Sequence, residues 1–208
     1  MSDLFYLQDS RSNVGSRATF WRIGGGYTSN LREAEQFTRA CAVKQYEARE
    51  TDVPWPVAYI EDRYEIGVDF QYLDSAAAAA TPNHDGRVFV AYDKAWDGND
   101  LIWIGGDGPT SDLVDAIHPG QETAEEYLSK GFRVWPVDYI VNKCRAVVRA
   151  ANLNHKQALR EAGLTLPKTK HVRIRSYNNL NNCGGCGRFL SERQRFNDCP
   201  NCGESNAP

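Results

Sequence analysis

The sequence predicts an α+β protein made of two copies of a small ββα-type module, followed by a short cysteine-rich segment. Three observations predict this class. Parts of the chain repeat one another about 80 residues apart, aromatic and β-branched runs alternate with amphipathic runs, and two Cys-x-x-Cys pairs lie near the C-terminus. The composition, 41% hydrophobic and 25% charged residues, excludes a disordered chain and a coiled coil.

The repeat has two parts. Residues 20–37 and 101–117 both carry an aromatic residue, Ile, paired glycines, Thr-Ser-Asn/Asp-Leu and, three residues later, Ala. Residues 53–63 and 133–143 share the run Trp-Pro-Val-x-Tyr-Ile. Because order and spacing both recur, we interpret the two stretches as copies of one module. Two copies are too few for a solenoid.

Each copy is expected to begin with two strands and to continue with helices. Aromatic and β-branched runs favour strands at 5–8, 18–23, 88–92 and 101–104. Glycines 24–26 and 105–106 suit turns with positive φ, and Asn30 and Asp112 suit helix N-caps. Amphipathic or proline-initiated runs predict helices at 39–49, 57–64, 122–128 and 137–151.

The predicted organisation has five segments. They are module copy 1 (1–73), an Ala-rich linker (74–86), module copy 2 (87–151), a basic connector with a short helix (152–179), and a four-cysteine segment (180–208). The short helix is expected over His155–Ala162, with Asn154 as its N-cap and Gly163 ending it.

Charge is divided unevenly along the chain. Residues 143–208 hold 12 Lys/Arg and four acidic residues, a net charge of +8, whereas residues 1–142 hold 12 Lys/Arg and 23 acidic residues, a net charge of −11. Such asymmetry favours a basic tail that meets a polyanion or an acidic half that meets a basic partner. Mutual neutralisation within the protein explains it equally well.

The strongest chemical signal is Cys183-x2-Cys186 followed, after twelve residues, by Cys199-x2-Cys202, with a glycine after each pair. Each pair suits a tight turn that places two thiolates on one side, and two such turns supply four tetrahedral ligands. The segment resembles the zinc-ribbon family over about 22 residues. The resemblance implies a structural zinc, with no open position for catalytic water, and the spacing also suits iron.

The basic residues near this segment are candidates for nucleic-acid binding, because Lys and Arg clusters gain affinity by releasing counterions from phosphates. The candidates are Lys156, Arg160, Lys168, Lys170, Arg173, Arg175, Arg188, Arg193 and Arg195. Phe189 and Phe196 alternate with the last three. Two interpretations stay open for these rings: they form the core of the ribbon, or they belong to a binding surface.

No catalytic set is recognisable, so no catalytic residue is assigned. The four histidines lack the spacing of known catalytic motifs, and no Gly-x-Ser-x-Gly occurs. Cys41 and Cys144 are expected to be small buried thiols in helices. The tryptophans at 21, 55, 103 and 135 are expected in the core, with base stacking as the alternative. The start of the chain does not read as a secretory signal, and no apolar run is long enough to cross a bilayer.

One further resemblance covers residues 4–63, through Tyr-Leu-Gln-Asp-Ser-Arg, Gly-Gly-Gly-Tyr-Thr-Ser-Asn-Leu-Arg-Glu-Ala-Glu-Gln-Phe-Thr and Ala-Val-Lys-Gln-Tyr-Glu-Ala-Arg-Glu-Thr-Asp. This stretch resembles small phage and prophage proteins of unassigned function. The resemblance implies a phage origin, the cytoplasm of a bacterial host, and an accessory role in infection. It brings no catalytic residues.

Two hypotheses follow. In the first, the protein is a non-enzymatic adaptor whose zinc ribbon and basic segment contact DNA, RNA or a nucleic-acid machine, while the modules contact a host or phage protein. In the second, the acidic modules inhibit a host enzyme, for instance a defence nuclease, by occupying a basic surface. The charge asymmetry motivates both hypotheses.

Overall fold

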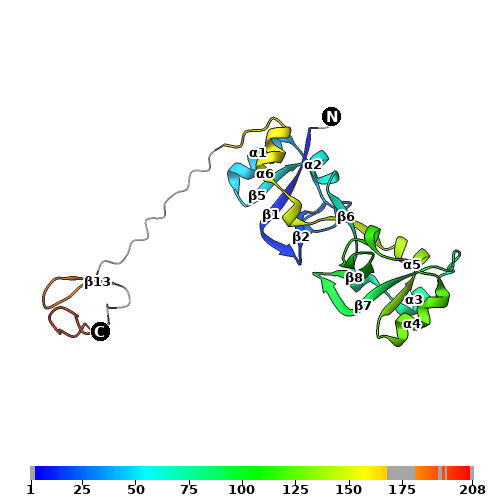
Figure 1. Cartoon of the computed structure of the whole chain (residues 1–208). Coiled ribbons are helices and arrows are strands. Elements are labelled where there is room, and N and C mark those ends of the chain that lie inside the picture. Colours follow the sequence, from blue (N-terminus) through cyan, green and yellow to red (C-terminus); the bar gives the residue numbers. More distant parts are fainter. Residues whose placement is uncertain (1–2, 168–180, 192–193, 195, 207–208) are drawn as a thin grey trace. The chain divides into compact units, whose positions relative to one another are not determined.

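The computed structural model describes residues 3–167, 181–191, 194 and 196–206. It has mixed α/β structure and divides into two compact units, Met1–Pro167 and Lys168–Pro208, called here the N-terminal and C-terminal units. Figure 1 shows their elements, and each unit is described by itself. No helix among the described residues is long and apolar enough to cross a membrane.

The N-terminal unit contains two antiparallel sheets that are each built around one long strand. In the first sheet β1 (Leu4–Val14) pairs with β2 and β4 and also with β5, and β3 pairs with β2. The bounds are β2 (Arg17–Trp21), β3 (Tyr27–Thr28), β4 (Gln36–Thr38) and β5 (Asp52–Pro56). The second sheet has the order β10-β7-β8-β9, with β7 (Val88–Asp97), β8 (Asp100–Gly105), β9 (Gly108–Thr110) and β10 (Arg133–Pro136).

Short helices connect and cover these strands. In chain order they are α1 (Arg39–Ala48), α2 (Val57–Glu61), α3 (Ser75–Ala80), α4 (Ala124–Ser129), α5 (Val137–Val141) and α6 (His155–Glu161). Single 3₁₀ turns lie at η1 (Phe70–Tyr72), η2 (Leu113–Asp115), η3 (Gln121–Thr123) and η4 (Ala150–Asn152). Thr38 caps α1 by accepting from the Cys41 N–H, and Ala42 is the residue of this helix that is fully buried.

A separate two-stranded ladder belongs to neither of these sheets. It pairs β6 (Tyr64–Val68) antiparallel with β11 (Cys144–Val148), and Ile66 lies opposite Ala146 at its centre. These two residues are 80 positions apart, the same spacing that separates Trp55 from Trp135. At the centre of this ladder, therefore, stretches of chain 80 residues apart face each other.

The helices that follow the two strands of this ladder pack on different hydrophobic cores. Helix α3 comes after β6, and its buried Ala78 joins the core that contains Trp103 and Trp135. Helix α6 comes after β11, and its buried Ala158 joins the core that contains Phe20 and Trp55. We call the first core, with β7–β10, α4, α5, β6, η1 and α3, lobe 2, and the second, with β1–β5, α1, α2, β11, η4 and α6, lobe 1. Lobe 2 is thus one continuous stretch of chain from β6 to α5, whereas lobe 1 combines the segment β1 to α2 with the later segment β11 to α6.

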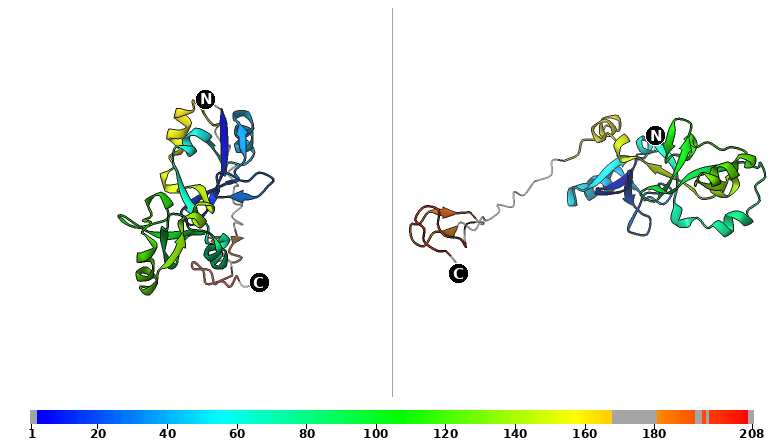
Figure 2. Two further views of the ribbon diagram at one scale, coloured as in Figure 1. Left: turned by 90° about the vertical axis from the view of Figure 1, so that its right-hand side faces the viewer. Right: turned by 60° about the horizontal axis from the view of Figure 1, so that its bottom comes forward.

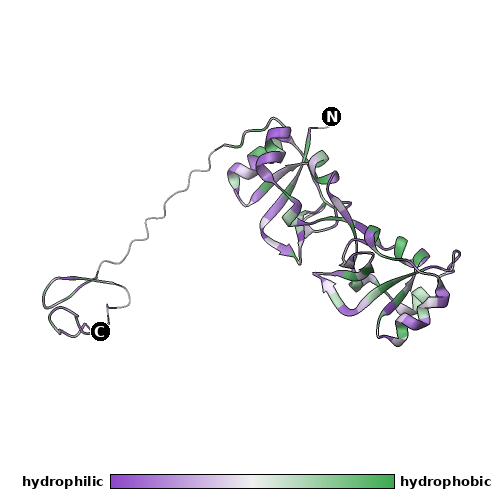
Figure 3. Cartoon of the chain, viewed as in Figure 1, coloured by the Kyte–Doolittle hydropathy of each residue, from purple (hydrophilic) through white to green (hydrophobic). Residues whose placement is uncertain are grey.

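In Figure 1 the yellow α6 lies beside the blue strands of lobe 1, whereas α3 lies among the green elements of lobe 2. Both turned views of Figure 2 show the yellow α6 next to blue and cyan elements. In Figure 3 hydrophobic and hydrophilic stretches alternate along the strands and helices of both lobes. Helices this short are stable only because a core covers their apolar side, here Ala78 or Ala158.

Similar hydrogen bonds join the start of α3 to lobe 2 and the start of α6 to lobe 1. The Tyr139 hydroxyl accepts from the Asp74 N–H at 2.8 Å in lobe 2, and the Tyr59 hydroxyl accepts from the Asn154 N–H at 3.1 Å in lobe 1. The same Asp74 and Asn154 side chains cap α3 and α6. Each tyrosine also stacks on the tryptophan four residues before it, Trp55 or Trp135.

Several expected elements differ in the structure. The helix expected at 137–151 ends at Val141, and residues 144–148 form β11, because this β-branched run pairs with β6. No helix follows Asn30, and Asp112 caps only the 3₁₀ turn η2. The Ala-rich stretch 74–86 contains α3, and α6 packs on the core of lobe 1. Helices 39–49 and 155–162 are confirmed to within one residue.

The C-terminal unit has, among its described residues, one small hairpin formed by β12 (Asn181–Asn182) and β13 (Phe189–Leu190). The buried residues described in this unit are Cys183, Leu190 and Cys199. With so few apolar side chains to bury, this unit needs a further source of folding free energy.

Candidate metal centre and buried ion-pair network

The four C-terminal cysteines converge. The sulfur atoms of Cys183, Cys186, Cys199 and Cys202 all lie within 4.8 Å of one another. Two sulfur–sulfur distances are 3.6 Å, for Cys183 and Cys202, and 3.7 Å, for Cys186 and Cys199. Tetrahedral ligands at about 2.3 Å from an ion are separated by about 3.8 Å, so the four thiols fit a tetrahedral metal ion.

Two matching turns bring the sulfurs together. The Gly187 N–H donates to the Cys183 carbonyl at 2.9 Å, and the Gly203 N–H donates to the Cys199 carbonyl at 2.8 Å. Both glycines have positive φ, of 70° and 74°. The sequence motif predicts this role, because a residue without a Cβ leaves such a turn at little steric cost.

Backbone N–H groups in the turns also point at sulfur. The Arg188 N–H and the Asn201 side chain lower the pKa of Cys186 to about 6. The N–H of Cys186 is the main cause that lowers the pKa of Cys183. Since the thiolate is the metal-binding form, these donors favour the ligand state of both cysteines.

The donor set restricts what the centre can do. Four thiolates fill a tetrahedral coordination shell, which leaves no position for a reactive water or a substrate. None of the four is in a disulfide; Cys183 and Cys199 are buried, and Cys186 and Cys202 are exposed. The arrangement suits an ion that holds the unit together and does not take part in chemistry.

Aromatic side chains beside the centre are exposed. Phe189 has 65% and Phe196 has 53% of its surface exposed, whereas Leu190 is buried. The interpretation of the two phenylalanines as the ribbon core is therefore wrong: Leu190 and the cysteines fill that place. Arg188 precedes Phe189 on the same hairpin and is exposed as well.

The other candidates for nucleic-acid binding lie partly in the N-terminal unit and partly outside the described residues. Lys156 and Arg160 are exposed on α6, in the N-terminal unit. Six candidates lie outside the described residues, namely Lys168, Lys170, Arg173, Arg175, Arg193 and Arg195. Three of the nine are therefore placed by the structure, and all three are exposed: Lys156, Arg160 and Arg188.

The structure tests the predicted burial of the tryptophans and of the two cysteines outside the cluster. Trp55, Trp103 and Trp135 are buried, which agrees with the core interpretation and leaves them no free face for bases. Cys41 is exposed on α1, and Cys144 is half-buried in β11, so the expectation of two buried helical thiols is wrong.

The N-terminal unit contains a buried ion-pair network that no sequence motif indicates. Its centre is Arg17, whose side chain is fully buried and contacts Glu65, Asp100 and Ser111. Arg145 binds Asp100 at 2.8 Å and Asp69 at 3.3 Å.

A second arginine anchors the same network. Arg149 binds Glu65 at 3.1 Å. Burial opposes ionisation of Glu65, but hydrogen bonds from Arg149 and Arg17 hold its pKa below the usual value. The carboxylate therefore stays charged, and each charge in the network has an opposite partner.

The network lies where the lobes meet, and positions about 80 residues apart carry opposite charges. Arg17 follows the Gly15 turn by two residues, as Asp100 follows the Gly98 turn. Glu65 of β6 and Arg145 of β11 are 80 positions apart in the sequence, although they are not paired across the ladder. Asp69 and Arg149, each one residue beyond its strand, are also 80 positions apart. Aligning residues 64–74 with 144–154 places these acidic residues opposite arginines in the sequence repeat. The alignment does not predict the network, because it does not show that the carboxylates are buried.

No family model, curated protein or solved structure matches the chain in comparisons with known proteins. Its function is therefore inferred from the residues and their geometry.

Proposed function

We propose that this protein is a non-enzymatic adaptor of phage type, whose C-terminal unit is a zinc ribbon that contacts nucleic acid or a nucleic-acid machine. The observation that carries the proposal is the exposed Arg188-Phe189 pair on a hairpin beside four clustered thiols. An exposed aromatic ring beside a guanidinium offers a stacking face and a phosphate contact.

Charge supports the same surface. Residues 168–208 contain seven Lys/Arg and three acidic residues, whereas residues 1–167 contain 17 Lys/Arg and 24 acidic residues. The excess of cations in the C-terminal unit favours a polyanion there, and their affinity for phosphates rises as salt is diluted. The motif's resemblance to zinc ribbons favours zinc over iron in the thiol site.

The test is fluorescence-anisotropy binding to labelled single- and double-stranded DNA and RNA between about 50 and 300 mM salt. The metal-loaded full chain is compared with the variants Arg188→Ala and Phe189→Ala. Arg32→Ala is the matched control, since Arg32 is an exposed arginine of the N-terminal unit. We expect both ribbon variants to weaken binding about tenfold, and the control to bind as the full chain does.

A truncated chain that ends at Pro167 removes the whole C-terminal unit. A shorter one that ended near Arg149 would also remove α6 from the core of lobe 1 and confuse loss of binding with unfolding. Loss of binding in the 1–167 chain supports the adaptor. Absence of binding by the full chain to every nucleic acid overturns the nucleic-acid part of the proposal.

A second function is favoured by the excess of seven acidic residues in residues 1–167. In this alternative the N-terminal unit inhibits a host enzyme by occupying a basic surface. The 1–167 chain separates the alternatives, because an inhibitor would keep its activity without the C-terminal unit, and an adaptor would lose it.

We also infer that the two lobes are copies of one module, in line with the repeated sequence. The matching order β6-η1-α3 and β11-η4-α6, at a constant offset of 80 residues, supports this inference. Each copy is longer than the repeat motifs indicate, since it includes α3 in the first copy and α6 in the second. The resemblance of residues 4–63 to phage and prophage proteins supports a role during infection of a bacterial cell.

A further inference from the structure

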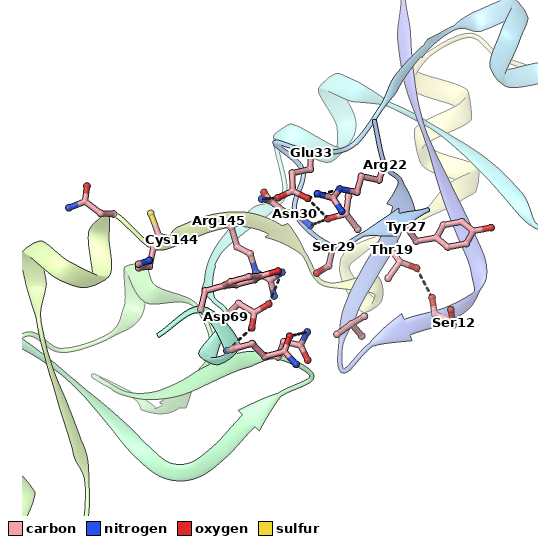
Figure 4. A pocket seen from close by; sticks show the side chains of 17 residues that line it. Ser12, Thr19, Arg22, Tyr27, Ser29, Asn30, Glu33, Asp69, Cys144 and Arg145 are labelled. Atoms are coloured by element: carbon pink, nitrogen blue, oxygen red, sulfur yellow. Dashed lines mark hydrogen bonds and ion pairs between the residues drawn. The ribbon is translucent and has the colours of Figure 1, made fainter. Parts of the chain in front are cut away.

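A polar cleft of about 620 Å³ lies between the two lobes within the N-terminal unit. One wall includes Ser29, Asn30 and Glu33 of lobe 1; the facing wall includes Asp69, which follows β6 of lobe 2, and Arg145 of β11 beside it (Figure 4). Its volume is in the range of clefts that hold small organic ligands. Neither the ion-pair network nor the thiol site accounts for this space.

The lining of the cleft includes a serine, Ser29, whose hydroxyl has no hydrogen-bond partner within the described part of the chain. Ser29 is 5% exposed, and no hydrogen bond joins its hydroxyl to any residue that the structure describes. The corresponding residue of the repeat is Ser111, in the second Thr-Ser-Asn/Asp-Leu run. The Ser111 hydroxyl accepts from Arg17 at 2.8 Å and from Arg149 at 3.0 Å.

Ser29 and Ser111 therefore have different surroundings, although they occupy matching positions in the repeated sequence. Ser111 is held by two arginines, so it is part of the structural network. Ser29 instead lies at the cleft, where Figure 4 shows it among the labelled lining residues. Because the Ser29 side chain lines the cleft, its hydroxyl can donate to or accept from a ligand that binds there.

The charges of the cleft indicate the kind of ligand. Arg22 pairs with Glu33 at 3.1 Å, and Arg145 pairs with Asp69 at 3.3 Å, so the walls neutralise themselves. The remaining charged lining residue, Lys143, lies over the ring of Tyr139 at 5.8 Å. A cleft with paired charges and many donors and acceptors favours a neutral ligand that can both donate and accept, which is the property of a hydroxyl group.

An aromatic ring stands beside these groups. Tyr72 lines the cleft and is 70% exposed, so its ring is open to a ligand. Hydroxyl groups around one apolar face are the surface of a sugar ring, whose C–H side packs on such an aromatic ring. We propose that this cleft binds a neutral saccharide, with Ser29 and Asp69 contacting its hydroxyls and Tyr72 its apolar face.

The test is titration of the metal-loaded full chain with glucose, N-acetylglucosamine and their short oligomers, followed by NMR chemical shifts. Uridine and adenosine form a second arm, since they carry ribose hydroxyls on a different scaffold. We expect a saccharide to shift signals of residues lining the cleft. The variants Ser29→Ala and Tyr72→Ala are each expected to weaken its binding about tenfold.

The control is Tyr64→Ala, which removes an exposed tyrosine that does not line this cleft. Thermal unfolding of each variant shows whether it is folded. No binding of any saccharide, binding of the nucleosides alone, or binding that both cleft variants leave unchanged overturns the proposal. Its outcome is independent of nucleic-acid binding by the C-terminal unit.

Discussion

Arg17 and Asp100 each follow a glycine turn by two residues, one in each lobe, and bind each other through Nε and Oδ2 at 3.0 Å. Both side chains are fully buried. Two identical modules would place two arginines or two aspartates together at this point, and like charges in a buried site repel strongly. The opposite charges therefore fit lobe 1 to lobe 2 and make each a poor partner for a second copy of itself.

Asp100→Asn is expected to reduce the free energy of unfolding by about 3 kcal/mol, because it leaves Arg17 and Arg145 without one of their buried partners. Urea unfolding of the full chain measures the change. Asp93→Asn serves as the control: its pair with Arg133 lies at the surface, where solvent screens ion pairs and they contribute little to stability. Equal effects for the two variants would contradict the central role of the network.

The two hairpin turns touch through glycines. Gly98 has a φ of 63°, and a Cβ there would lie 2.6 Å from the carbonyl carbon of Val14 in the other turn. Gly98→Ala is therefore expected to cost well over about 2 kcal/mol, from backbone strain and from separation of the turns. Gly86→Ala is a matched control, since Gly86 also has a φ of 63° but has open space around its Cβ position. Its cost is expected to be about 1 kcal/mol, and both are read from thermal unfolding.

The positions of α3 and α6 predict that the lobes stay together when the chain is cut between α3 and β7. A protease site inserted after the exposed Asp85 allows the cut. The two fragments are expected to elute together in native size-exclusion chromatography and to separate only in denaturant, because each core contains a helix from the other fragment. Separation under native conditions would show that the packing of α3 and α6 does not hold the two fragments together.

Loss of one thiol is expected to unfold the C-terminal unit alone. Cys183→Ser removes a buried member of the four-sulfur cluster, and metal content per chain should fall from about one ion to none. Cys41→Ser is the control, because Cys41 is an exposed thiol on α1. Elemental analysis measures the metal, and the absorption spectrum separates colourless zinc from coloured iron–thiolate. Retention of the ion by Cys183→Ser would contradict the four-cysteine site.

Acid is expected to weaken the N-terminal unit through its carboxylates. Although burial opposes ionisation of Glu65, bonds from the arginines lower its pKa in the folded state. Its contribution to stability is therefore present above the unfolded value of 4.5 and is lost as pH falls through the lower folded value. Glu65→Gln should flatten the fall of the melting temperature below pH 4.5. Glu47→Gln, at an exposed position of α1, should leave the curve unchanged.

Local features were predictable because neighbouring residues determine them. The thiol site, the helices α1 and α6, and the trailing glycines all follow from spacing and capping within a few residues. The end of α5 was missed because Cys144–Val148 become a strand only when β6 is there to pair with them. The exposure of Phe189 was open for a similar reason, since Leu190 competes for the same small core.

By itself, the sequence determined the four candidate ligands, the mixed helix and strand content, the recurrence of motifs about 80 residues apart, and the uneven charge. Only the tertiary structure decided which lobe each of α3 and α6 completes, and that Arg17 and Asp100 meet. It alone showed that Ser29 lines a cleft whereas Ser111 is held by arginines. The physical reason is distance along the chain: these contacts join residues 38 to 95 positions apart, beyond the reach of any local pattern.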